Sequence, residues 1–151
     1  MVASSESILV TNIDNDVAAI NVSATSPSPC LTYEAQEGVV TTVAEVRLNS
    51  APAPGKVVNL TVASSDEGEC VPNVTSLLFN ETNWETPQAV GFEGINDHVD
   101  DENQNCIFTF SVDTTVSDAA PAYTSATTNG TVTCENVDNN FAAINVTATD
   151  P

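Results

Sequence analysis

The chain is poor in cationic side chains: Arg47 and Lys56 stand against 21 aspartates and glutamates, and the formal net charge is −19. Phosphate groups need cationic partners, so nucleic acid and an anionic membrane surface are both excluded as partners. A compact chain with this charge repels itself, and we therefore expect a cation among its carboxylates.

Catalytic motifs are also scarce. His98 is the one histidine, and neither a Gly-x-Ser-x-Gly elbow nor a phosphate-binding loop is present. Two of the many carboxylates could serve glycoside hydrolysis, but that chemistry needs a substrate cleft, for which a small sandwich has little room. The sequence therefore predicts that the protein is not an enzyme.

Long apolar runs are missing too. No stretch approaches the length of a membrane span, and residues 1–7 lack the basic start and apolar core of a signal peptide. We expect no membrane insertion, and we expect any secretion signal to lie upstream or to have been removed. Disorder is disfavoured, because 41% of the residues are apolar and they fall in alternating runs.

The chain does contain an internal repeat. Residues 12–25 return as residues 136–149, an offset of 124 residues, which is about the length of one β-sandwich domain. This predicts that residues 1–16 are the C-terminal strand of a preceding repeat. Residues 17–140 would be one complete repeat, and residues 141–151 the first strand of a following repeat. Such arrays more often span distance than turn over a substrate.

Short segments with period-two alternation fill most of the chain and predict strands. They are residues 18–25, 30–33, 39–48, 57–63, 76–79, 88–92, 106–112 and 128–134. The first is separated from the second by prolines at 27 and 29, which cannot donate to a β-ladder. In 39–48 the expected alternating apolar residues are Val40, Val43, Val46 and Leu48. About seven strands at this spacing predict an all-β, immunoglobulin-like antiparallel sandwich.

Four cysteines without a Cys-x-x-Cys pair, beside a single histidine, favour disulfides over zinc and an oxidising compartment. Six Asn-x-Ser/Thr sequons are consistent with N-glycosylation and with an extracellular or cell-surface location. They begin at Asn21, Asn59, Asn73, Asn80, Asn129 and Asn145.

The block from Leu78 to Val90, with Asn83-Trp84 and Pro87-Gln88 at its centre, resembles the signature of Calx-beta-type repeats. These repeats were named for the calcium-regulatory domains of sodium–calcium exchangers and are common in large bacterial and algal surface proteins. Residues 34–38, 47–52 and the acidic segments at Asn96-Asp97 and Asp138 also resemble the family, so that the resemblance covers residues 17–140. Trp84 is expected to pack over a sheet face.

The resemblance implies a calcium site. Calcium takes six to eight oxygen ligands, mostly from carboxylates and carbonyls. By resemblance the ligands are the carboxylates of Glu34, Asp66, Asp97, Asp101 and Asp138, with the backbone carbonyl of Val99.

Two departures from the family lower the charge at this site. Asn96 stands where the family has an acid, and Asn139 and Asn140 follow Asp138 at a terminus that can carry three acids. Amide oxygens still coordinate, so we expect one or two ions. Asp14 and Asp16 end the preceding repeat, so the ion would lie at the joint between repeats and stiffen it.

Sandwiches of this kind commonly run the half-strand after the first break parallel to the last strand. With that arrangement, Cys30 and Cys134 are neighbours, each four residues before an expected ligand. Cys70 and Cys106 follow Asp66 and Glu102 by the same four residues. From the three pairings of four cysteines we therefore predict Cys30–Cys134 and Cys70–Cys106.

Taken together, these features predict a calcium-stiffened structural repeat of an extracellular filament or adhesin, whose partners are neighbouring copies of the same repeat. Residues 1–16 and 141–151 could pair across subunits by strand exchange. The alternative is a surface module that binds carbohydrate or ice, for which Thr127, Thr128, Thr131 and Thr133 form a candidate row.

Overall fold

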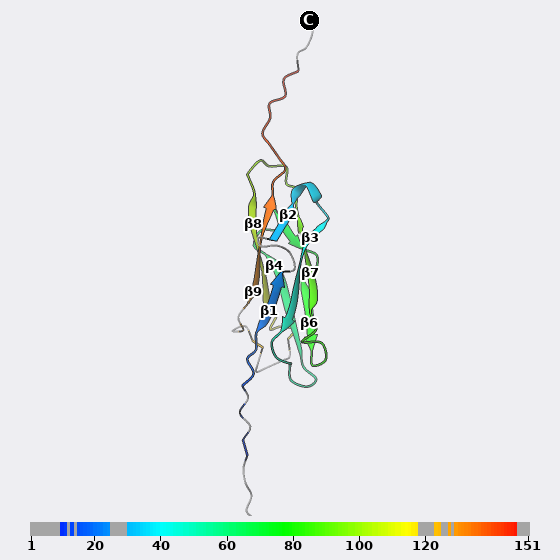
Figure 1. The fold of residues 1–151 in the computed structure, drawn as a ribbon, viewed down its shortest axis with the longest axis vertical. Helices are drawn as coiled ribbons and strands as arrows, with labels where there is room; N and C mark the ends of the chain where they lie inside the picture. The colour runs from blue at the N-terminus through cyan, green and yellow to red at the C-terminus, as the bar shows by residue number, and fades with distance from the viewer. Residues whose placement is uncertain are drawn as a thin grey trace, which may run out of the picture.

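The computed structural model describes residues 10, 11, 13, 15–24, 30–117, 123, 124, 127 and 129–147. They form an elongated two-layer sandwich of β-sheets (Figure 1). The segment before the first strand leaves one end of the sandwich, and the segment after the last strand leaves the opposite end. We call this second end, from which residues 138–147 leave, the C-terminal pole.

Nine strands and one short 3-10 helix make up the described sandwich. In chain order they are β1 (Ile20–Ala24), β2 (Cys30–Tyr33), the helix η1 (Glu34–Gln36), β3 (Val40–Leu48), β4 (Val57–Ser64), β5 (Cys70–Pro72), β6 (Ser76–Asn80), β7 (Gln88–Gly94), β8 (Gln104–Val112) and β9 (Gly130–Val137). One sheet has the order β1-β3-β7-β5 and the other β2-β9-β8-β4-β6.

This order confirms the predicted all-β sandwich, since all nine described strands lie in two packed sheets. The strand number exceeds the predicted seven for two reasons. The first strand is divided into β1 and β2, which lie in different sheets, and β5 is a three-residue strand that pairs with β7. Neighbouring strands run antiparallel except β2 and β9, which run parallel.

The core lies between the two sheets and is built on phenylalanine. Phe79, Phe92, Phe108 and Phe110 are fully buried. The rings of Phe92 on β7 and Phe108 on β8 stack with centroids 4.0 Å apart, so the two sheets touch through aromatic side chains. Trp84 packs against this core from the turn between β6 and β7, as expected.

Two disulfides join the strands, and both predicted pairings are confirmed. Cys30 of β2 bridges Cys134 of β9, its register partner, with the Cα atoms 4.3 Å apart. Cys70 of β5 bridges Cys106 of β8 across the two sheets. Disulfides persist where thiols are not kept reduced, so the chain belongs in an oxidising, extracytoplasmic compartment.

The expected alternation in β3 is correct only in its second half. Val46 and Leu48 are buried, but the core positions before them are Thr42 and Ala44, and Val40 is 38% exposed. The register of β3 on β7 shifts between Val40 and Thr42, as at a β-bulge, and so reverses which side chains face inward.

The repeated segments have different structures in this chain. Ile20 of β1 is 8% exposed and lies opposite Leu48 of β3, whereas Ile144, its counterpart in the repeat, is 93% exposed. No strand forms over residues 141–147. Within the described part of the chain, no helix has the length and apolarity needed to cross a membrane.

Candidate metal centre

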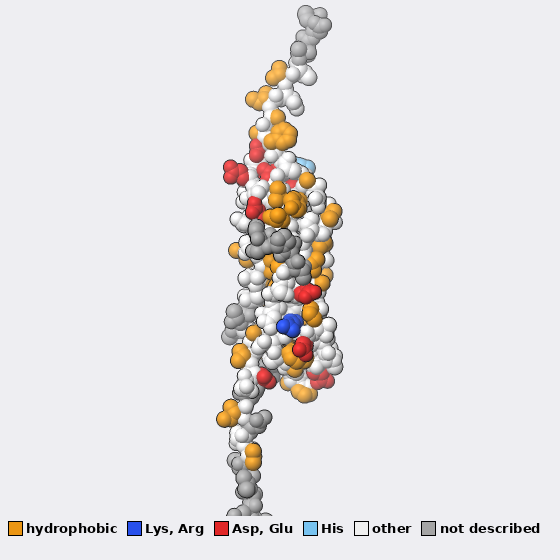
Figure 2. All heavy atoms as spheres, viewed as in Figure 1, with side chains coloured by type: hydrophobic (Ala, Val, Ile, Leu, Met, Phe, Trp, Pro, Cys, Tyr) orange, Lys and Arg blue, Asp and Glu red, His pale blue; other side chains and the backbone are white. Residues whose placement is uncertain are grey.

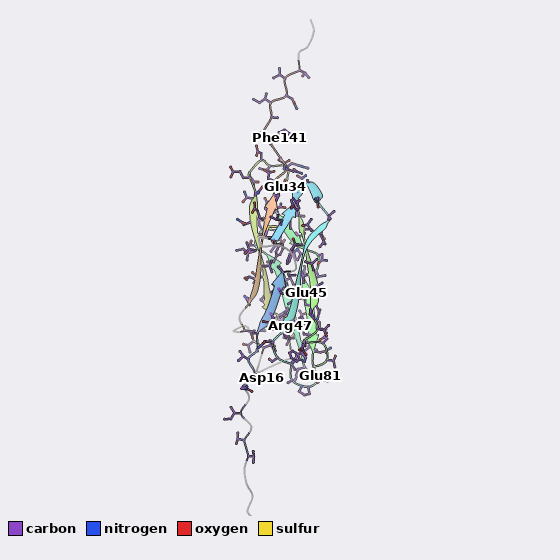
Figure 3. All side chains as sticks on the ribbon, in the orientation of Figure 1. Asp16, Glu34, Glu45, Arg47, Glu81 and Phe141 are labelled. Carbon is purple, nitrogen blue, oxygen red and sulfur yellow. A yellow bond between two sulfur atoms is a disulfide. The ribbon has the colours of Figure 1, made fainter. Side chains whose placement is uncertain are left out.

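Four segments meet at the C-terminal pole, and each contributes acidic side chains. Glu34 begins η1 directly after β2, and Asp66 and Glu69 lie in the loop between β4 and β5. Residues 95–103 connect β7 to β8, and Asp138 follows β9. Figure 2 shows carboxylates beside the one histidine at this end, and Figure 3 places Glu34 there, close to the start of the C-terminal segment.

Glu34 is a buried carboxylate with one oxygen that lacks a hydrogen-bond partner among the described residues. It is 1% exposed, and its Oε2 accepts a hydrogen bond from Nδ2 of Asn140 at 2.8 Å. Its Oε1 is buried and has no hydrogen-bond partner among the described residues. An unpaired buried carboxylate oxygen is unfavourable in the absence of a compensating partner.

Burial raises the pKa of Glu34, and the neighbouring charges of Asp138, Asp97 and Glu69 raise it further, while a backbone hydrogen bond from Asn139 lowers it. The charged form of Glu34 is therefore disfavoured by both its surroundings and its neighbours. A cation beside Oε1 would offset both effects.

Three further carboxylates converge at this pole. Oxygen atoms of Glu69, Asp97 and Asp101 all lie within 4.8 Å of one another, and Glu69 is only 6% exposed. Burial raises the pKa of Glu69, as do the charges of Asp101, Asp97 and Asp66, while its hydrogen bond with Asn136 lowers it. An all-oxygen donor set of this charge fits a hard divalent cation such as calcium or magnesium.

The loop between β7 and β8 is held in a backbone conformation that non-glycine residues rarely adopt. His98 and Glu102 have φ angles of 65° and 68°, in the left-handed region. Oδ1 of Asp97 accepts a hydrogen bond from the Val99 amide at 2.8 Å, and Oδ1 of Asn96 accepts one from the His98 amide at 3.1 Å. These contacts fold the loop so that Asp97 and Asp101 both come close to Glu69.

The predicted ligands are placed as follows. Asp97 and Asp101 belong to the converging group, whereas Glu34, Asp66 and Asp138 lie outside it. Glu34 interacts electrostatically with Asp97 and Glu69, and Asp138 interacts with Glu34. Asp66 interacts with Glu69. Asn96 and Val99 lie in the same loop. Asp16 lies at the opposite end of the sandwich from Glu34 (Figure 3), and Asp14 is outside the described residues.

Glu69 is the site residue that the sequence interpretation missed. Asp66 was chosen as the acid of its loop, but Glu69 directly precedes Cys70, whose disulfide to Cys106 fixes this part of the loop against β8. In the sequence its one distinguishing feature is its place next to a cysteine, because its burial appears only in the folded chain.

A separate shallow groove of about 430 Å³ lies far from this pole, over β1 and β3. It is lined by Asn21, Val22, Ser23, Glu45, Arg47 and Pro87. Glycoside hydrolysis uses a pair of carboxylates, and Glu45 is the only acid in this lining.

Comparisons with known proteins support the fold but do not assign the chain to a family. No family model matches the chain, and no curated protein matches it either. Among solved structures, the crystal structure of the E. coli chaperone DraB is similar, with a TM-score of 0.51 at 7% sequence identity. The match covers 84% of this chain and spans 59% of the DraB chain. The chain is therefore a two-sheet, disulfide-bonded β-sandwich, and its likeness to DraB is one of fold alone.

Proposed function

We propose that the chain is a structural repeat of an extracellular filament or adhesin, stiffened by calcium bound at the C-terminal pole. The carrying observation is the buried Glu34, whose Oε1 has no hydrogen-bond partner among the described residues. Its carboxylate interacts electrostatically with Asp97 and Glu69 of the converging group, so one cation would compensate several groups together.

The pole also contacts the segment that leads out of the sandwich. Asn140 donates to Glu34, and the backbone amide of Ala142 donates to Oδ2 of Asp100 at 2.6 Å. The amide of Asp138 donates to Oδ1 of Asn103 at 3.1 Å. A cation that orders these acids would also fix the direction in which residues 138–143 leave, and this is how calcium would stiffen the joint.

The internal repeat supports a head-to-tail arrangement of neighbouring sandwiches. Residues 141–147 repeat residues 17–23, which lead into β1 and form most of it, with Phe in place of Val17 and Thr in place of Ser23. They lie exposed at the end opposite to the start of β1. As the first strand of a following repeat they would place the next sandwich beyond this pole. Contacts of this head-to-tail kind generate rods when they do not close into rings.

We propose calcium and not magnesium for two reasons. The resemblance to Calx-beta-type repeats implies calcium, and calcium takes six to eight oxygen ligands, which suits a pole on which many oxygens converge. The extracellular location draws on the disulfides and the sequons. Four of the six sequon asparagines are exposed, namely Asn21, Asn73, Asn129 and Asn145.

A calcium titration of the chain, followed by calorimetry, tests the proposal. We expect one or two ions to bind, and we expect binding to be lost in the double variant Glu69→Gln/Asp101→Asn, which removes two of the three converging charges. A chain that binds no calcium at millimolar concentration would contradict the proposal.

Glu45→Gln/Glu81→Gln is the matched control, because it also removes two charges, from exposed acids away from the pole (Figure 3). This variant should bind calcium as the unchanged chain does. Equal losses in the pole variant and in the control would show that calcium responds to net charge alone.

A further inference from the structure

A buried polar cluster adjoins the converging carboxylates and shares Glu69 with them. Thr32, Glu69 and Asn136 are 0%, 6% and 1% exposed, and they come from β2, from the loop before β5 and from β9. Nδ2 of Asn136 donates to Oε2 of Glu69 at 3.1 Å and to the carbonyl oxygen of Ile95 at 3.3 Å. Oδ1 of Asn136 accepts from the Thr32 hydroxyl at 3.0 Å.

The partners determine which way the Asn136 amide points. The Ile95 carbonyl can only accept a hydrogen bond, and so can an ionised Glu69 carboxylate. The amide nitrogen must therefore lie toward these two groups, which leaves the amide oxygen toward Thr32, whose hydroxyl can donate. With this arrangement the side-chain amide makes three hydrogen bonds in a buried setting.

The Asn136 amide occupies space that a side chain at Gly94 would need. A Cβ atom added to Gly94 would clash with Oδ1 of Asn136 and would lie 2.8 Å from the backbone of Tyr33. The absence of a side chain at Gly94, the last residue of β7, thus lets Asn136 reach across from the other sheet.

We infer that Asn136 is a positioning residue for the cation site: it holds Oε2 of Glu69 and leaves the other carboxylate oxygen for an ion shared with Asp97 and Asp101. The inference rests on the proposed function, because it describes how that site is built. Hydrogen-bonded partners of metal-ligating carboxylates orient them, and their removal typically lowers metal affinity by about 10–100-fold.

Thr32 would act on the ion indirectly, through its hydrogen bond to Asn136. Its hydroxyl is the donor that satisfies the Asn136 oxygen, so removing it weakens the preference of the amide for its present orientation. Its effect on calcium affinity should have the same sign as that of Asn136 and a smaller size.

The test is calorimetric calcium titration of the full chain and of two variants. Asn136→Ala should weaken calcium binding by about tenfold or more, and Thr32→Val, which keeps the side-chain shape, by a few-fold. If Asn136→Ala does not fold, the calcium affinity of Thr32→Val tests the positioning role instead.

Tyr123→Phe is the control for the loss of a buried hydroxyl. The Tyr123 hydroxyl donates to the Ser50 carbonyl at 2.8 Å, beyond the far end of β3. This variant should lower the melting temperature and leave calcium affinity unchanged.

The outcomes separate the inference from the function on which it rests. If the unchanged chain binds calcium and Asn136→Ala and Thr32→Val bind it as tightly, the positioning role is wrong and the site stands. If the unchanged chain binds no calcium, both fail.

Discussion

Replacing Cys30 and Cys134 by alanine should lower the free energy of unfolding by about 5 kcal/mol. The bridge closes a loop with a sequence separation of 104 residues, and in the chain-entropy model a loop of that length restricts the unfolded chain by this amount. Domains are typically stable by about 5–15 kcal/mol, so the loss would be a large fraction of the total. Urea denaturation measures it.

The second bridge provides the comparison. Cys70–Cys106 has a sequence separation of 36, for which the same model predicts about 4 kcal/mol. Both double variants should be clearly destabilised, with Cys30→Ala/Cys134→Ala the more affected. A change below about 1 kcal/mol for either variant would show that the bridge restrains little in the unfolded chain.

Ile20→Asp should destabilise the chain by at least about 3 kcal/mol, whereas Ile144→Asp should change its stability by less than about 0.5 kcal/mol. The two isoleucines occupy equivalent places in the repeat. Ile20 is 8% exposed in the core and Ile144 is 93% exposed. An aspartate at position 20 would be buried opposite Leu48 without a partner, but at position 144 it would lie in solvent.

Thermal unfolding and light scattering of the two variants check this pair. If Ile144→Asp were the more damaging change, and if it also dissociated an oligomer, separate chains would be exchanging strands. The segment 141–147 of one copy would then occupy the place of β1 in another, and the linear covalent array would be wrong.

Much of the fold could be predicted from local pattern. Alternation in residues 57–63 and 106–112 corresponds to β4 and β8, and the prolines at 27 and 29 separate β1 from β2. The β-bulge in β3 could not be predicted, because it depends on the register with β7 and not on β3 itself. Val40 is 38% exposed and lies over Gly91, where an added Cβ would come within 2.5 Å of its Cγ1.

The candidate site was predictable in composition but not in its geometry. The loop of Asp97 and Asp101 is recognisable by its charge, and both residues belong to the converging group. Glu69 was missed because its burial depends on the Cys70–Cys106 bridge and on Asn136, which lies 67 residues away in the sequence. A single sequence contains no local signal for such a contact.

Calcium at the C-terminal pole is the central claim, and thermal unfolding with calcium and with excess chelator tests it most directly. A ligand at a hundredfold excess over its dissociation constant stabilises the folded state by about 2.7 kcal/mol. For a domain of this size that corresponds to a rise in melting temperature of roughly 5–10 °C. We predict such a rise, and we predict that Glu69→Gln/Asp101→Asn abolishes it. The same melting temperature in calcium and in chelator would contradict the account, and the carboxylates of the pole would then be surface charge.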